Sequence, residues 1–265
     1  MRNQLFVSLF LLTLTGIASG QMINQRCAAG LRQGYWEAID SRGYLVFAGY
    51  FKDNIPVGEM RRFFPTGELR VIMYYHDNTG VNARARFFWP EGGLAAEGNY
   101  VDRARDSVWT YYIQGTQRIS SRVEYSAGKR HGLEQKFYPS GRIADETMWK
   151  DDMKHGTWKQ FFDNGQLKLV ATHVNNKLEG AFTTYYPNGK IEIEGFFSNG
   201  TPDGNWVRYD DEGNYIATVK YDNGIITNLD ELEETDITFF MNALEPEQYI
   251  PEITIEDMMR DLQGR

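Results

Sequence analysis

The sequence predicts a mainly β protein: an elongated array of stacked antiparallel β-hairpins, about eight repeats of 24 residues, with a short helical C-terminal extension. Three observations lead to this expectation. Glycine recurs at a fixed interval, the residues around it favour tight turns, and aromatic residues recur at fixed distances from it. The 16 Phe, 16 Tyr and 6 Trp among 265 residues also indicate a folded chain, because disordered segments are poor in aromatics.

Glycine marks the repeat. Six glycines are separated by multiples of 24 residues, apart from a two-residue excess in the middle: Gly34, Gly58, Gly132, Gly156, Gly180 and Gly204. In the gap, Asn82 and Asp106 stand at the equivalent places, which makes eight copies over residues 34–227. We assign the two extra residues to the fourth copy, between Gly115 and Tyr125. Periods of this length are typical of repeat architectures.

Each copy has the pattern of one hairpin and a return loop. Residues 185–190 read Tyr-Tyr-Pro-Asn-Gly-Lys, in which proline presets φ for a type I turn and Gly189 supplies the positive φ that follows. This combination predicts a hairpin with a bulge beside the turn. Because one hairpin cannot bury its apolar face alone, we expect the copies to stack, each covering its neighbour.

One position of the repeat, five residues after the first glycine, is aromatic in seven copies of eight. These seven residues are the candidate binding ladder: Phe63, Phe87, Tyr111, Phe137, Phe161, Tyr185 and Tyr209. A second aromatic follows directly in six copies. Successive strand residues point to opposite faces, so we expect rings on both faces, one face packed inward and the other half exposed. Either face could hold the ladder.

The first 20 residues have the features of a secretory signal peptide. Arg2 gives a positive start, residues 5–17 are apolar, and Ala18-Ser19-Gly20 offers small residues before a cleavage point. The apolar run is too short to span a membrane comfortably, and no later segment is apolar enough. We therefore expect an exported protein: periplasmic, envelope-associated or secreted. Residues 21–33 would form an N-terminal segment, in which Cys27, the only cysteine, has no intramolecular disulfide partner.

Residues 228–265 are expected to form a helical C-terminal extension. The first predicted helix has its apolar face at Ile237, Phe240, Met241 and Leu244. A second, short helix is predicted from Thr254, with Ile255, Met258 and Leu262 on its apolar side. Open repeat arrays must cover their last apolar face, so we expect a cap; the alternative is an arm that docks on a partner.

Charge and motifs argue against several functions. The net charge of −8 disfavours nucleic acid and anionic lipid as partners, because both attract basic surfaces. The sequence has no nucleophile elbow, phosphate loop or zinc-protease helix motif, and we expect neither catalysis nor a cofactor. His131 and His155 share a repeat position with Glu179 and Asp203, but ligands in a line do not make a tetrahedron, so we expect no metal site. His173 falls at a ring position and is expected to be packed.

Two copies carry a resemblance to a known repeat. Residues 156–167 (GTWKQFFDNGQL) and 180–191 (GAFTTYYPNGKI) resemble the bacterial variant of the MORN repeat, which occurs in proteins often labelled antitoxins of the YwqK family. The resemblance covers residues 34–227. It implies an elongated hairpin array used as a scaffold or binding surface, without shared catalytic residues. The third and fourth copies depart from the pattern, with Asn82 and Asp106 in place of the turn glycine.

Two classes of function remain. The first is a non-catalytic scaffold that binds another protein through its aromatic-rich β surface. The second is a cell-wall or glycan-binding module that stacks sugars on the ladder. An antitoxin-like partner of a toxin is a further alternative from the resemblance, although an export signal does not suit a cytosolic antitoxin. Flat rings exposed at regular spacing favour a glycan, whereas a contiguous patch favours a protein.

The export signal generates a first prediction. The mature chain should begin near Gln21 and lie outside the cytoplasm, because Ala18-Ser19-Gly20 follows an apolar run. Mass spectrometry of the native N-terminus checks this. An intact Met1 on protein from the soluble cytosol would contradict it and favour the antitoxin-like alternative.

Overall fold

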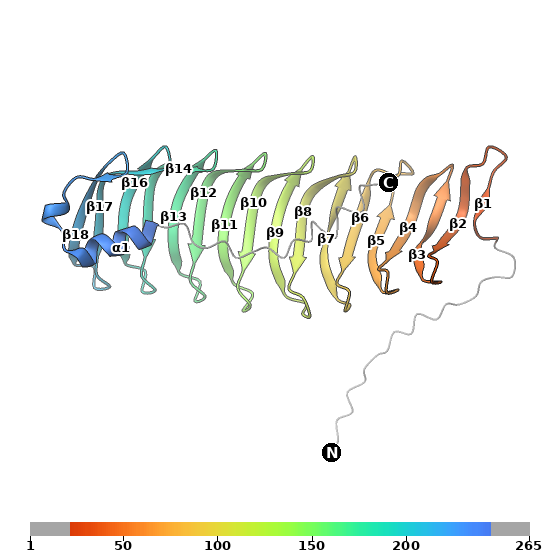
Figure 1. The fold of residues 1–265 in the computed structure, drawn as a ribbon, viewed down its shortest axis with the longest axis horizontal. Helices are drawn as coiled ribbons and strands as arrows, with labels where there is room; N and C mark the ends of the chain where they lie inside the picture. Colours follow the sequence, from red (N-terminus) through yellow and green to blue (C-terminus); the bar gives the residue numbers. More distant parts are fainter. Residues whose placement is uncertain (1–21, 245–265) are drawn as a thin grey trace, which may run out of the picture.

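The computed structural model describes residues 22–244, which form one open antiparallel sheet of 19 strands followed by a helix (Figure 1). The predicted array of stacked hairpins is confirmed, since each long strand pairs with the strands before and after it in the chain. The elements are β1 (Gln25–Arg26), β2 (Arg32–Ile39), β3 (Leu45–Lys52), β4 (Ile55–Phe63), β5 (Leu69–Tyr75), β6 (Ala83–Phe88), β7 (Leu94–Val101), β8 (Ala104–Tyr112), β9 (Ile119–Ser126), β10 (Lys129–Phe137), β11 (Ile143–Lys150), β12 (Met153–Phe161), β13 (Leu167–Val174), β14 (Lys177–Leu178), β15 (Gly180–Tyr185), β16 (Ile191–Ser198), β17 (Thr201–Tyr209), β18 (Tyr215–Asp222), β19 (Ile225–Ile226), the 3-10 helix η1 (Leu229–Glu231) and α1 (Glu234–Leu244).

Strand pairing corrects the register of the third and fourth copies. Each copy starts at the residue that pairs with a ring on the second strand of its hairpin, as Gly58 pairs with Tyr75. By this criterion Ala83 and Ser107 are the start residues of copies 3 and 4, because they pair with Tyr100 and Tyr125. The assignment to Asn82 and Asp106 was therefore wrong by one residue.

The assignment of both extra residues to the fourth copy was also wrong, because they lie in two different copies. One lies in the loop between Tyr75 and Ala83, which pair with each other across β5 and β6. The other lies in the turn of copy 4, where the backbone bond runs from Ile113 N–H to Arg118 O, while its equivalent in copy 2 runs from Phe64 to Glu68. Consecutive aromatic residues hid this shift, because a one-residue slip exchanges the two faces of a strand and leaves a ring on each.

The predicted hairpin turns are confirmed. Gly141, Gly165 and Gly189 have φ of 89°, 89° and 86°, the left-handed conformation that glycine adopts without strain. In the turn of copy 7, Gly189 N–H donates to Tyr186 O at 2.8 Å, and a register shift falls between Thr184 and Tyr185. The turn and the bulge together direct the two strands of each hairpin into the common sheet.

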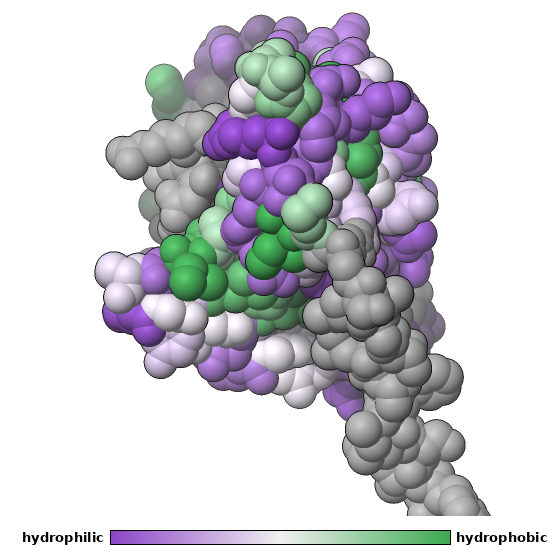
Figure 2. All heavy atoms as spheres, turned by 90° about the vertical axis from the view of Figure 1, so that its right-hand side faces the viewer, coloured by the Kyte–Doolittle hydropathy of each residue, from purple (hydrophilic) through white to green (hydrophobic). Residues whose placement is uncertain are grey.

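One face of the sheet, the core face, holds the ring that pairs with each start residue. These side chains are Phe51, Tyr75, Tyr100, Tyr125, Trp149, His173, Phe197 and Tyr221. Between them lie Trp109 and Trp206, both without exposed surface. Figure 2 views the array from its N-terminal end and shows hydrophobic residues gathered near the centre, with hydrophilic residues around them. The opposite face is called the outer face below.

Two glycines let the tryptophans lie against the sheet backbone. A Cβ on Gly195 would stand 2.2 Å from Trp206 Cδ2, and one on Gly98 would stand 2.3 Å from Trp109 Cδ2. Each indole N–H donates to the carbonyl of the residue that follows the glycine: Trp206 to Phe196 at 3.2 Å and Trp109 to Asn99 at 3.0 Å. One copy thereby packs onto the backbone of the copy before it.

Asparagine side chains block both edges of the array. At the N-terminal edge, Asn24 N–H donates to Tyr35 O, and Asn24 Oδ1 accepts from Glu37 N–H at 2.9 Å. At the C-terminal edge, Asn228 is buried; its Oδ1 accepts from Lys220 N–H at 2.8 Å and its amide donates to Thr218 O at 3.0 Å. Backbone groups of the edge strands are thus bonded within the chain and do not template pairing with another sheet.

Helix α1 covers the core face of the last copies (Figure 1). Phe240 has no exposed surface and belongs to the cluster around Trp206, with Phe239 and Ala243 packed against it. The predicted apolar stripe was partly wrong, because Met241 is 60% exposed and Phe239 takes part in the packing. Within residues 22–244, no helix has the length and apolar character needed to span a membrane. The predicted signal peptide and second helix lie outside the described residues.

Gly189 supplies a test of the turn geometry. Replacing it by valine should lower the free energy of unfolding by about 1 kcal/mol or more, because a β-branched residue resists positive φ. Gly189→Asn is the control, since asparagine tolerates this conformation and should retain most of the stability. Urea denaturation of both variants measures the difference, and equal stability of the valine variant and the wild type would contradict the assigned turn.

The packing of α1 generates a second stability test. Phe240→Ala should lower the free energy of unfolding by about 3 kcal/mol, the usual cost of emptying a buried phenylalanine site, whereas Met241→Ala should have little effect. Thermal and urea unfolding of the pair measure this.

Deletion of residues 228–265 should have a larger effect, because it removes both α1 and the Asn228 edge block. We expect earlier melting and self-association on size exclusion. A truncated protein that stays monomeric with unchanged melting would show that the extension does not cap the array.

Candidate functional site

The outer face carries a continuous row of half-buried rings. We call them the ladder residues: Phe63, Phe88, Tyr112, Phe137, Phe161, Tyr185 and Tyr209. In copies 1 to 7 the residue at this position pairs with a leucine or isoleucine on the next strand, as Phe63 pairs with Leu69 and Tyr185 with Ile191. The row therefore has an aliphatic border along most of its length.

Five of the seven predicted ladder residues lie in this row. The other two do not: Phe87 lies in the core cluster without exposed surface, and Tyr111 packs against the same cluster. Their places in the row are taken by Phe88 and Tyr112, as the one-residue register correction requires. Sequence reasoning could have found this from the position of Gly92, one residue later than in other copies, which indicates that copy 3 begins one residue later.

Charged side chains cover parts of the ladder. The guanidinium of Arg86 lies 5.6 Å from the ring centre of Phe88, and that of Arg122 lies 5.6 Å from the ring centre of Phe137. Such contacts are favourable cation–π interactions. An arginine side chain of the protein itself therefore lies over each of these two rings.

Two tyrosines of the row bond to carboxylates of the preceding copy. Tyr112 Oη donates to Glu97 Oε1 at 2.8 Å, and Tyr209 Oη donates to Glu194 Oε1 at 2.7 Å. Burial, followed by the bond to Glu97, raises the pKa of Tyr112. The bond to Glu194, followed by burial, raises the pKa of Tyr209. Both hydroxyls hence stay protonated and occupied at neutral pH.

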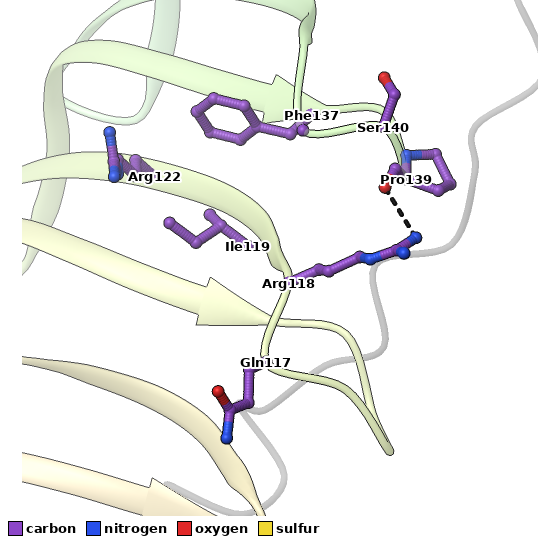
Figure 3. A pocket seen from close by; sticks show the side chains of 8 residues that line it. Gln117, Arg118, Ile119, Arg122, Phe137, Pro139 and Ser140 are labelled. Atoms are coloured by element: carbon purple, nitrogen blue, oxygen red, sulfur yellow. Dashed lines mark hydrogen bonds between the residues drawn. The ribbon is translucent and has the colours of Figure 1, made fainter. Parts of the chain in front are cut away.

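The outer face is hollowed where copies 4 and 5 meet, at their hairpin turns (Figure 3). The depression has a volume of about 600 Å³ and is lined by Gln117, Arg118, Ile119, Arg122, Phe137, Pro139, Ser140 and Gly141. Arg118 spans the two turns, donating from Nη1 to Pro139 O at 2.9 Å (Figure 3). The longer turn of copy 4 supplies this arginine. Sequence reasoning did not find this site, because it depends on contacts between the turns of two neighbouring copies.

The histidine column bonds the return loops. His131 Nδ1 lies 3.3 Å from Asp151 Oδ1, and His155 Nδ1 lies 3.3 Å from Asn175 Oδ1. Glu179, at the same repeat position, accepts from Asn199 N–H at 2.8 Å. Each of these side chains therefore bonds to the return loop that follows the second strand of its own hairpin. Over the part of the chain that the structure describes, no group of three or more His, Cys, Asp or Glu is arranged to hold a metal ion.

His173 is packed in the core face, as predicted. It is 6% exposed, and its ring centre lies 5.4 Å from that of Trp158. Burial, with a smaller contribution from the positive charge of Lys154, lowers the pKa of His173 to about 4. The imidazole is therefore neutral in the folded protein at neutral pH.

Four of the copies match the sequence model of a known repeat family. The sequence model of the MORN repeat variant matches residues 56–77, 130–151, 154–175 and 178–199. Each matched segment begins two residues before the start glycine of copy 2, 5, 6 or 7 and covers that copy's hairpin. These four copies are similar in sequence to the MORN repeat variant. A search of curated proteins gives no match to the chain.

The buried histidine predicts a pH dependence. A folded pKa of about 4 lies below the ordinary value of 6.5, so between these values the unfolded chain binds a proton that the folded chain does not. Stability should be full above about pH 6.5 and should fall by up to about 3 kcal/mol as the pH drops toward 4. Urea unfolding across this range, wild type against His173→Phe, measures the effect. Parallel pH profiles for the two proteins would contradict it.

Proposed function

We propose that this chain is an exported, non-catalytic scaffold that binds another protein through the ladder residues of its outer face. The observation that carries the proposal is the continuity of the row, which runs through seven successive copies on one face of a single sheet. The similarity of four copies to the MORN repeat variant supports a binding role for the array. Aromatic and arginine side chains, which lie together on this face at Phe88 and Phe137, are among the residue types enriched at protein interfaces.

The environment of the rings favours a protein over a glycan. A sugar platform needs flat ring faces open to solvent, whereas Arg86 and Arg122 stack on Phe88 and Phe137. The hydroxyls of Tyr112 and Tyr209 are bonded to carboxylates and are not free to orient a sugar. The result is a mixed surface of rings and charges.

The depression between copies 4 and 5 is the proposed anchor point of this surface. It combines the Phe137 ring and the Ile119 side chain with two guanidinium groups, from Arg118 and Arg122. A partner side chain with an apolar body and a carboxylate end fits this chemistry. Binding energy at protein interfaces concentrates in a few residues that become desolvated when the partner binds.

Location and lack of catalysis are parts of the proposal that rest on the sequence. The features of residues 1–20 support export, and the absence of catalytic motifs supports a binding role. An antitoxin-like role would also use a protein partner, and the site of the mature N-terminus separates the two.

The test uses the mature chain, residues 21–265, as bait in the envelope fraction of the source cells, followed by direct titration with each captured protein. Arg122→Glu should weaken the binding by about tenfold or more, because it reverses the charge at the anchor point. Val174→Glu is the control, since Val174 is exposed but lies at the return-loop end of β13.

Equal binding by both variants and the wild type would contradict the proposed surface. Retention of the wild-type protein on purified cell-wall glycan, lost on Phe161→Ala, would favour the glycan-binding alternative. The folded state of each variant is checked by its melting curve.

A further inference from the structure

The core face changes its chemistry along the array. Beneath α1, in copies 7 and 8, the residues two positions before the start glycine are Leu178 and Pro202, and Leu178 packs against the cluster that holds Phe240. In copies 4 to 6 the same position is basic: Arg105, Arg130 and Lys154. The face is thus apolar under the helix and cationic beyond it.

The basic side chains lie over the rings of the core face. The guanidinium of Arg105 lies 4.2 Å from the ring centre of Tyr125, that of Arg130 lies 3.6 Å from Trp149, and Lys154 Nζ lies 5.8 Å from Trp158. They form a border of positive charge along the rings.

Two carboxylates also lie on this stretch, and both bind tryptophan. Trp149 Nε1 donates to Glu134 Oε2 at 2.6 Å, and Trp158 Nε1 donates to Asp145 Oδ2 at 2.8 Å. Lys136 pairs with Asp145 on the same face. Arg130 Nε also lies 3.4 Å from Asp152 Oδ1. Four basic groups therefore stand against three carboxylates in copies 4 to 6, which leaves a net positive surface.

Helix α1 shows what this face binds. Arg208 Nη1 donates to Asp236 Oδ1 at 3.0 Å, and the Arg208 guanidinium lies 3.6 Å from the ring centre of Phe239. Lys136 occupies in copy 5 the repeat position that Arg208 occupies in copy 8. The recognised chemistry is a carboxylate beside an apolar side chain.

The chain continues past α1 with that chemistry. Residues 245–265 hold six carboxylates and two arginines, and between them stand the apolar residues Tyr249, Ile250, Ile253, Ile255, Met258, Met259 and Leu262. Figure 1 shows the C-terminal end of α1 directed along the array toward β13 and the middle copies. The chain therefore becomes more acidic after α1, and the core face becomes basic in the copies beyond α1.

The length of the segment suits the distance. Neighbouring strands lie about 4.8 Å apart, so three two-stranded copies span about 29 Å. Twenty-one residues cover about 31 Å as a helix and up to about 70 Å when extended. Within residues 22–244, α1 is the only element that lies over the core face.

We propose that residues 245–265 dock on the core face of copies 4 to 6, carboxylates against the basic border and apolar side chains against the rings. In this proposal the segment extends along the core face the cap that α1 begins. This inference does not depend on the outer-face function, because it concerns the opposite side of the sheet.

Crosslinking within the full mature chain tests the proposal. In a Cys27→Ser background, one cysteine is placed in the segment, at Tyr249 or at Met259. The second replaces either Lys136, on the core face, or its neighbour Gln135, on the outer face. A short bismaleimide should link the Lys136→Cys variants within one chain at least about tenfold more efficiently than the Gln135→Cys variants, because docking raises the effective concentration on one side only.

The linked peptides are identified by mass spectrometry, and melting curves confirm that each variant folds. Equal yields at positions 135 and 136, or no link at 136 from either segment position, would overturn the proposal. A link at 136 between two chains would show that a second copy covers the face, which also overturns it.

A second measurement uses substitutions that lie outside the sheet. The triple variant Glu252→Gln, Glu256→Gln and Asp257→Asn should show faster backbone hydrogen exchange in β10 and β11 than the wild type, while exchange in β3 and β4 stays constant. Unchanged exchange in β10 and β11 would contradict the charge pairing on which the docking is argued.

Discussion

A single-layer sheet must build a core from its own side chains, and in this protein the contact between a tryptophan and the backbone of the preceding copy makes that possible. Trp206 lies over Gly195, its ring centre 5.4, 5.0 and 6.1 Å from those of Phe182, Phe197 and Tyr221. Any side chain at Gly195 would occupy the space of the indole. The interface between copies is therefore the core itself, as expected where stability is a sum over neighbouring repeats.

This arrangement leaves two problems at the ends of the array: exposed edges and an uncovered last copy. Asn24 and Asn228 protect the edges by bonding backbone groups of β2 and β18. Helix α1 covers the last copy with Phe240, a ring that comes from outside the repeats. The Arg208–Asp236 pair orients the helix on the sheet, and its partly buried position protects it from solvent screening.

The two faces of the sheet consequently have different roles. The core face holds the large rings and the interactions between copies, so its residues are constrained by packing. The outer face carries a ring in seven copies, each half buried and bordered by aliphatic or charged side chains. A continuous row of rings that keep part of their surface open to solvent is the physical basis of the proposed protein-binding surface.

The sequence by itself determined the repeat, its length, the turns and the single β-rich array, because glycine and aromatic spacing reflect local backbone and strand geometry. It placed Phe63, Phe137, Phe161, Tyr185 and Tyr209 correctly in one row. The tertiary structure decided the positions of Phe87 and Tyr111, because aromatic doublets permit two registers and the pairing of Ala83 and Ser107 selects one. In the sequence, the late Gly92 is the signal of this shift in copy 3. The depression beside Arg118 and the choice of core face likewise depend on contacts between neighbouring copies, which a pattern within one copy does not contain.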